Sequence, residues 1–314
     1  MPERMVIVTG ATGFIGRAVC RRLISNGYEI AVLTRDRDKA KAVFGDRVLA
    51  VEWDGRTAIG WRELASRAEA VVNLAGENIG AGRWTKERKA RILESRVQAG
   101  RAVVDGLRLA SPRPGTLIQA SAVGFYGPRG DEEIDETSPR GEGFLAETVR
   151  AWEESTREAE DLGVRRAVIR SGLVLDKSGG VLPRLSLPFK FFVGGKLGSG
   201  EHWISWIHRD DEVEAIYWLL RRRDLAGVFN LVAPETLRQK QLARALARAM
   251  KRPAWIPVPG FALKWIFGAM AEETLLSGQK VLPAALLRED FQFRYPDIGT
   301  ALRQIFAHGE GAGG

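Results

Sequence analysis

The segment TGATGFIG, residues 9–16, directly follows a short apolar run and opens an apolar pattern of helical spacing. A buried strand that ends in a glycine-rich turn and enters a helix is typical of dinucleotide-binding folds. Gly10 allows the tight turn, Gly13 lets the backbone approach a pyrophosphate, and Gly16 lets the helix pack closely. Unpaired N–H groups and the dipole at the helix N-terminus favour the negative charge of the diphosphate. The alternative is a glycine turn without a ligand.

The whole turn is predicted to contact the dinucleotide, because its backbone wraps the phosphates and its flanking side chains border them. The residues predicted to bind are Thr9, Gly10, Thr12, Gly13, Phe14, Ile15 and Gly16.

Near-continuous apolar runs recur along the chain and alternate with helical patterns. Such runs are typical of parallel strands that are buried on both faces. The expected strands are residues 5–8, 29–34, 48–53, 70–74, 116–121, 166–171 and 228–232. This alternation predicts an α/β fold, a Rossmann-type doubly wound parallel sheet, with a smaller C-terminal substrate lobe.

The domain division follows from where the alternation weakens. We expect residues 1–172 to form the nucleotide-binding core, with residues 205–232 returning to it. Clustered glycines and prolines assign residues 173–204 and 233–308 to the substrate lobe, with a C-terminal extension from about 252. Residues 309–314, GEGAGG, are expected to be disordered.

Charge and composition limit the classes of partner. The net charge of +8 suggests nucleic acid, but Asp and Glu are mixed with the basic residues nearly everywhere, so we expect no nucleic-acid partner. Residues 255–276 contain prolines and charges and predict a docking helix, with membrane contact as the lesser alternative; we expect no membrane partner. Three His and one Cys show no metal-ligand spacing, so no metal is expected.

The location is expected to be cytoplasmic. A strand begins almost at once, which leaves no room for a targeting peptide. The single Cys20 excludes a disulfide framework and suits a reducing compartment. Its place in an apolar helix pattern indicates a core residue rather than a nucleophile.

The end of the second strand indicates which nicotinamide cofactor is bound. NAD sites place an acidic residue there for the ribose 2′-hydroxyl, whereas NADP sites place a cation. Here the strand ends in Thr34-Arg35, and the planar guanidinium suits a 2′-phosphate. Asp36 opposes a phosphate, but further cations follow it. We therefore predict NADP(H), with Thr34 and Arg35 in contact with it.

The fourth strand ends in Leu74-Ala75-Gly76, whose small residues let the backbone lie against a ribose. Several further segments resemble an atypical branch of the extended short-chain dehydrogenase/reductase superfamily. These are residues 76–96, 121–127, 143–153, 170–183, 198–211 and 278–293. The branch is called the epimerase family protein, type 39U, and has its own short C-terminal extension. The resemblance implies that Leu74, Ala75, Gly76, Glu77 and Arg96 border the cofactor.

One feature of the superfamily's chemistry is missing. Its reductases and epimerases use a Ser, a proton-donating Tyr, and a Lys that lowers the pKa of the Tyr. Ser121 stands at the end of the fifth strand, where the resemblance implies the catalytic Ser, and it also borders the cofactor. The helix that should open with Tyr-x-x-x-Lys has Phe144 and Thr148 instead.

Three alternatives remain for the reaction. Another acid serves: Tyr126 is the first candidate, followed by Glu147, His202 and His208. The chemistry needs little acid catalysis, or the protein binds the cofactor without turnover. Packing is the alternative role for Tyr126, and capping of a helix for His208.

The sequence therefore predicts an NADP(H)-dependent oxidoreductase or epimerase-like enzyme that acts on an unidentified small molecule. Ser121 and Tyr126 are the predicted catalytic residues. The rival hypothesis is a non-catalytic NADP-binding regulator or scaffold with a protein partner, for example in division control. Either is compatible with a homo-oligomer.

Overall fold

A seven-stranded parallel sheet forms the centre of the computed structural model, which describes residues 4–307. The spatial order of the strands is β3-β2-β1-β4-β5-β7-β12. Their bounds are β1 (Met5–Thr9), β2 (Glu29–Thr34), β3 (Leu49–Glu52), β4 (Ala68–Asn73), β5 (Thr116–Ala122), β7 (Arg165–Ser171) and β12 (Gly227–Leu231). The predicted Rossmann-type α/β fold is confirmed.

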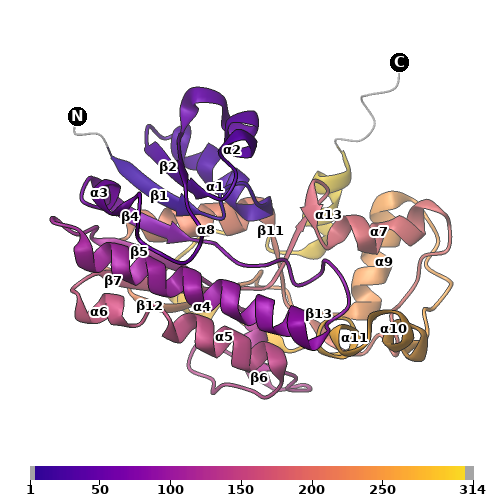
Figure 1. Ribbon diagram of the computed structural model, residues 1–314. Helices are drawn as coiled ribbons and strands as arrows, with labels where there is room; N and C mark the ends of the chain where they lie inside the picture. The colour runs from indigo at the N-terminus through magenta and orange to yellow at the C-terminus, as the bar shows by residue number, and fades with distance from the viewer. Residues whose placement is uncertain (1–3, 308–314) are drawn as a thin grey trace.

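Helices cover both faces of this sheet (Figure 1). One face carries α1 (Phe14–Ile24), α2 (Arg37–Phe44) and α8 (Arg209–Arg221), and the other carries α3 (Arg62–Ala65), α4 (Lys86–Leu109), α5 (Phe144–Glu154) and α6 (Glu158–Asp161). Val6 and Val8 pack into the first core, whereas Met5 and Ile7 pack into the second. Successive side chains of a strand point to opposite faces, so a strand covered on both sides must be apolar throughout. Cys20 is buried in the first core, as expected.

The helix that opens at Phe144 is interrupted between Glu154 and Glu158. Two side chains at the break bond to carbonyls of the preceding turn: Ser155 Oγ donates to Trp152 O at 2.6 Å, and Thr156 Oγ1 donates to Glu153 O at 3.2 Å. Such bonds compete with the helical backbone pattern.

The smaller lobe is built from short elements around a core of its own. The remaining strands and α-helices of residues 4–307 are β6 (Glu133–Ile134), β8 (Leu173–Asp176), β9 (Gly179–Gly180), α7 (Leu182–Lys190), β10 (Trp203–Ile204), β11 (Trp206–His208), β13 (Leu237–Arg238), α9 (Gln239–Met250), α10 (Gly260–Phe267), α11 (Ala269–Thr274), β14 (Lys280–Val281), α12 (Ala284–Arg288) and α13 (Ile298–Ala307). Of these, α12 packs into the first core of the sheet, and β6 and β14 pack with Tyr126 in a further cluster. Gly268, at φ +60°, separates α10 from α11 within the expected single helix. The predicted tail, residues 309–314, lies outside the described residues.

His208 begins α8 as its N-cap residue, buried between the core and the lobe. Its Nδ1 accepts from Asp210 N at 3.0 Å, and its Nε2 lies 2.9 Å from Gln304 Oε1. Both ring nitrogens are therefore occupied, and the capping alternative for His208 is confirmed.

Two searches were limited to residues 4–307. None of the helices there is both long and apolar enough to cross a bilayer. Nor do three or more His, Cys, Asp or Glu side chains gather there as a metal site would require.

Glu212 on α8 is a buried carboxyl whose Oε1 accepts from Ser171 Oγ at 2.5 Å, while its Oε2 has no partner among the described residues. Burial raises the pKa of Glu212 from 4.5 to about 8. Between these values the unfolded chain is ionised while the folded protein keeps the proton, so stability falls as the pH rises. The carboxyl thus destabilises the fold at neutral pH.

The Glu212→Gln variant tests this directly, because glutamine still accepts from Ser171 but cannot ionise. Its free energy of unfolding should exceed that of the wild type by a few kcal/mol near pH 8, and by much less near pH 5. Urea denaturation at both pH values measures this difference. Glu214→Gln on the same helix, which removes an ion pair with Arg22 instead, should lack this pH dependence. An equal effect of Glu212→Gln at both pH values would contradict the account.

Candidate cofactor site and active site

The carboxyl ends of β1 and β4 are joined by one hydroxyl. Thr9 Oγ1 donates to Asn73 Oδ1 at 2.6 Å and accepts from the backbone N–H groups of Leu74 and Ala75, both at 3.1 Å. Gly10 follows at φ +65°, and a Cβ there would lie 2.6 Å from Leu74 O. Only glycine allows both this backbone conformation and this approach.

The N-terminus of α1 lies open above this junction. Gly13 is its N-cap residue, no side chain caps it, and its first turn contains no acidic residue. A Cβ on Gly16 would lie 2.3 Å from Gly10 O, so this glycine lets the helix begin directly on the turn. The Phe14 ring packs against Gly179 of β9. Thr12 and Ile15 are half-buried beside it. The arrangement fits a diphosphate.

The end of β2 presents cations to the same edge. Arg35 is exposed, and no ion pair of its guanidinium occurs among the described residues. The Asp36 carboxylate instead caps α2, accepting from Lys39 N at 2.9 Å, and Thr34 Oγ1 accepts from Asp36 N at 3.2 Å. Asp36, the acidic residue that would repel a phosphate, is therefore engaged in capping a helix.

A half-buried cation of α4, Arg96, lies beside the residues that follow β4. The Arg96 side chain packs against Gly76, where a Cβ would lie 3.1 Å from its Cζ, and it stacks on the Trp152 ring at 4.9 Å. Its Nη1 donates to Ile92 O, and desolvation lowers the pKa of Arg96 to about 10. Glu77 nearby is joined to Arg88 at 3.4 Å. Arg96 keeps donors available for an anionic or hydroxyl group.

Two buried polar side-chain atoms on α5 also lack a hydrogen-bond partner among the described residues. They are Thr148 Oγ1 and Trp152 Nε1. Buried polar groups are normally hydrogen-bonded, and these two lie one helical turn apart. Together with the glycine cradle and Arg96, they fit a dinucleotide that carries ribose hydroxyls. Thr148 thus stands at the predicted Lys position with an unused donor.

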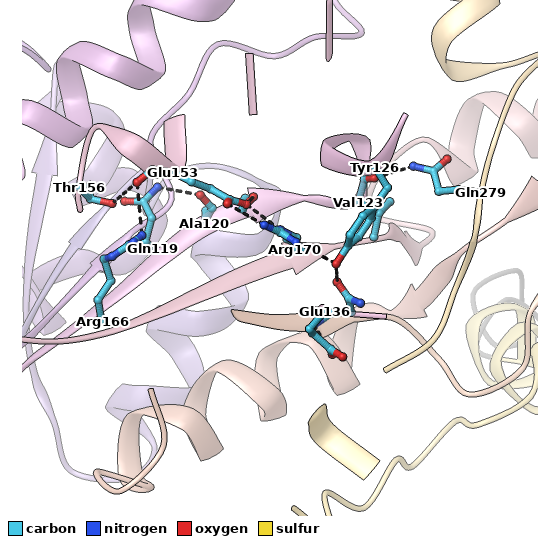
Figure 2. Close-up of polar contacts among 12 residues, drawn as sticks. Gln119, Ala120, Val123, Tyr126, Glu136, Glu153, Thr156, Arg166, Arg170 and Gln279 are labelled. Atoms are coloured by element: carbon cyan, nitrogen blue, oxygen red, sulfur yellow. Dashed lines mark hydrogen bonds and ion pairs between the residues drawn. The ribbon is translucent and has the colours of Figure 1, made fainter. Parts of the chain in front are cut away.

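Ser121 at the end of β5 bonds to a carboxylate that the sequence analysis did not identify. Ser121 Oγ donates to Glu153 Oε1 at 2.5 Å. Arg170 on β7 holds the same carboxylate bidentately, with Nε and Nη2 donating at 2.8 and 2.9 Å (Figure 2). A guanidinium fork of this kind binds the ionised carboxylate. The Ser121 proton is thus directed at an anion.

Tyr126 lies at the other end of this network. Its hydroxyl accepts from Arg170 Nη1 at 2.9 Å and donates to Asn230 Oδ1 at 2.8 Å, and its side chain is fully buried (Figure 2). Burial raises the pKa of Tyr126. Since its one proton is already donated and burial opposes ionisation, this geometry favours the packing alternative over proton transfer by Tyr126.

Phe144 occupies the predicted Tyr position and packs in an apolar cluster. Its ring meets Trp84 edge-on at 5.1 Å, and Phe267 and Met270 of the C-terminal extension join the cluster. Glu273 of α11 then caps α5, accepting from Phe144 N at 3.3 Å and Leu145 N at 2.9 Å. The extension therefore covers the place where a catalytic Tyr would open the helix.

The two remaining acid candidates, Glu147 and His202, lie outside the hydrogen-bond network of Ser121. Glu147 is exposed on α5. His202 is half-buried in the lobe, where desolvation lowers its pKa and Nε2 has no partner among the described residues. Neither side chain bonds to the Ser121 network.

A signal for this network was present in the sequence. Ser121 ends the fifth expected strand, Arg170 stands one residue before the end of the sixth, and the structure pairs the two directly in the sheet. Paired residues of adjacent strands point to the same face, so two polar residues near the ends of adjacent strands could have been expected to lie close together. Glu153 comes from the intervening helix, and its orientation required the three-dimensional packing.

Removal of the Glu273 carboxylate should loosen the extension. In Glu273→Ala the first two N–H groups of α5 lose their acceptor, at a cost of about 1 kcal/mol in the free energy of unfolding. Urea denaturation measures this loss. Glu273→Gln keeps an acceptor and should lose less, whereas Glu272→Ala removes only an exposed ion pair with Lys264 and serves as the control. A loss in the control as large as in Glu273→Ala would refute the capping role.

Comparisons with known proteins agree with this geometry. Residues 6–169 match the NAD dependent epimerase/dehydratase family, and residues 258–305 match a domain of unknown function, DUF1731. The chain is 42% identical over 310 residues to the epimerase family protein SDR39U1 homolog, chloroplastic, of Arabidopsis thaliana, covering 96% of this chain and 87% of the relative. It is 35% identical to the epimerase family protein YfhF of Bacillus subtilis, covering 96% and 98%.

A solved structure, that of human epimerase family protein SDR39U1 with NADPH, is also similar. Its TM-score is 0.85 at 32% identity, covering 96% of this chain and 99% of the human chain. The predicted resemblance to the type 39U branch is confirmed. The glycine turn, the parallel sheet and the C-terminal extension thus place this chain in the NAD dependent epimerase/dehydratase family, among the SDR39U1-like epimerase family proteins.

Proposed function

We propose that this chain is an NADP(H)-dependent oxidoreductase or epimerase-like enzyme acting on a small molecule. The observation that carries the proposal is Arg35 at the end of β2, exposed beside an uncapped α1 N-terminus, with Asp36 engaged in capping α2. The similar human protein was solved with NADPH. The cofactor is NADP(H).

Different residues of the chain hold different parts of NADP(H). The turn from Gly10 to Gly16 and the α1 N–H groups bind the diphosphate, and Arg35 with Thr34 binds the 2′-phosphate. Arg96, which packs against Gly76, and Thr148 bind ribose hydroxyls. When bound, NADP(H) supplies or accepts the hydride.

Proton handling falls to Ser121 and Glu153. Because Ser121 Oγ donates its proton to Glu153, its lone pairs remain available to a substrate hydroxyl. A substrate O–H proton passes to Ser121 Oγ as the Ser121 proton passes to Glu153 Oε1, and reduction runs the same transfers in reverse. Arg170 holds Glu153 in place. This relay takes the role that Tyr and Lys have in the superfamily.

The substrate, in this proposal, lies between the core and the lobe. The lobe is joined to the loop that follows Ser121 by Gln279 Nε2, which donates to Val123 O at 2.6 Å (Figure 2). Trp203 Nε1 donates to Asp131 Oδ1 at 2.8 Å on the same side. The division into a core of residues 1–172 with 205–232, and a lobe formed by the rest, belongs to this proposal.

A second candidate is a cofactor-binding regulator without turnover. The apolar packing of Phe144 favours it, because no proton donor stands at the usual position. A broad panel of carbonyl and alcohol substrates with purified protein and NADPH or NADP⁺ separates the two. Turnover of any member supports the enzyme, and tight NADPH binding without oxidation across the panel supports the regulator.

The Arg35→Asp variant tests the cofactor assignment. Loss of a charge-assisted bond, about 1.5–3 kcal/mol, should weaken NADPH binding by about tenfold to a hundredfold or more while NADH affinity changes little. Fluorescence titration with both nucleotides measures the ratio, with NADH as the internal control. Equal losses for the two nucleotides would refute the 2′-phosphate role of Arg35.

Variants of the relay should separate binding from chemistry. Ser121→Ala removes the relay atom and Glu153→Gln removes the proton acceptor, so each should lower turnover about a hundredfold or more with NADPH affinity nearly unchanged. Glu154→Gln, which changes the adjacent exposed carboxylate, is the matched control. Full activity of Ser121→Ala would show that the relay is wrong even if NADPH binding is confirmed.

A further inference from the structure

The tip of the lobe exposes aromatic side chains that no element covers. Every large aromatic side chain that is strongly exposed in residues 4–307 lies in two segments, residues 187–196 and 251–266. We name these two segments the aromatic tip. The exposed fractions are 69% for Phe191, 52% for Phe192, 69% for Trp255, 77% for Phe261 and 82% for Trp265. Soluble proteins rarely gather so much apolar surface in one place without a function for it.

Backbone and side-chain bonds join the two segments into one surface. Trp255 Nε1 donates to Phe192 O at 2.7 Å, and the Ile256 and Val258 N–H groups donate to Gly194 O and Lys196 O at 3.1 and 2.9 Å. Figure 1 shows the loops at this end of the lobe extending beyond α7, α9 and α10, away from the large sheet. The aromatic groups are therefore held in place by the fold.

Helix α10 adds an outward-facing apolar side to the tip. Leu263 is its only buried residue, and Phe261 and Trp265 are one turn apart on the side facing away from it. A helix that packs by Leu263 and the half-buried Phe267 while exposing Phe261 and Trp265 has much of its apolar surface toward something other than its own core.

The charges of the aromatic tip indicate what kind of partner it binds. The aromatic tip contains five Lys or Arg residues and no Asp or Glu, although the whole chain has 39 acidic residues among 314. Lys264 pairs with Glu272 just outside the tip, and Arg252 stacks on the Phe192 ring at 4.5 Å. The tip thus combines Trp and Phe side chains with a cationic rim, which is the composition of surfaces that bind anionic bilayers.

We propose that the aromatic tip docks on the surface of a bilayer containing anionic phospholipid. Trp255, Phe261 and Trp265 enter the boundary between headgroups and acyl chains, and the Lys and Arg residues contact lipid phosphates. This reverses the sequence-based expectation of no membrane partner, which rested on the prolines and charges that interrupt residues 255–276. Surface docking does not require a spanning helix.

Vesicle sedimentation with the full-length protein tests the proposal. Wild type should pellet with phosphatidylcholine vesicles that contain about one quarter phosphatidylglycerol, and far less with phosphatidylcholine alone. Added salt should weaken the binding. The double variant F261S/W265S should lose at least tenfold in vesicle affinity, because it removes the outward apolar side of α10. Ile59→Ser, which removes an exposed apolar side chain on the core (79% exposed), is the control and should bind like wild type.

Three results would overturn the proposal. Wild type could fail to bind either vesicle, or the Ile59→Ser control could lose as much affinity as F261S/W265S. As the third result, wild type could be an oligomer in gel filtration and F261S/W265S a monomer, with neither binding vesicles. The aromatic tip would then be an interface between copies of the chain. Because both changed side chains are exposed, thermal unfolding and NADPH affinity should match wild type, which separates this test from that of the proposed function.

Discussion

The close approach of β1 to the end of β4 is the constraint on which the rest of the site depends. Thr9 ties the two strand ends together by three hydrogen bonds, and Gly10 removes the Cβ that would meet Leu74 O at 2.6 Å. Only with this junction closed does α1 begin where its free N–H groups face the same edge as Arg35 and Gly76. Gly10 thus shapes the edge at which the proposed diphosphate, 2′-phosphate and ribose contacts lie.

The departure from the superfamily's usual chemistry has a structural counterpart. Phe144 packs with residues of the C-terminal extension, and Glu273 from the same extension caps α5. A tyrosine at that position would bring a hydroxyl into an apolar cluster, where it would need a partner. The absence of the Tyr and the packing of the extension therefore form one arrangement, and in the proposed mechanism proton transfer falls to the Ser121–Glu153–Arg170 network.

The pattern of apolar residues and the turn residues between the strands were sufficient to predict the sheet, because buried parallel strands need apolar residues on both faces. The glycine turn, the Ser121 position and the capping by His208 could be predicted for the same local reason. Glu153 and Glu273 could not, because each acts on a partner far along the chain, at Arg170 and Phe144. The break after Glu154 was also missed, since Ser155 and Thr156 are ordinary helix residues until they bond back to the preceding turn.

The central claim is that NADP(H) lies with its phosphate on Arg35 and its reactive ring beside Ser121 rather than Tyr126. A crystal structure of the protein with NADPH tests it most directly. The account predicts the 2′-phosphate within hydrogen-bond distance of the Arg35 guanidinium, and Ser121 Oγ as the proton-bearing side-chain atom nearest the nicotinamide C4. A 2′-phosphate away from Arg35, or a Tyr126 hydroxyl that has left Asn230 to face the nicotinamide, would contradict it.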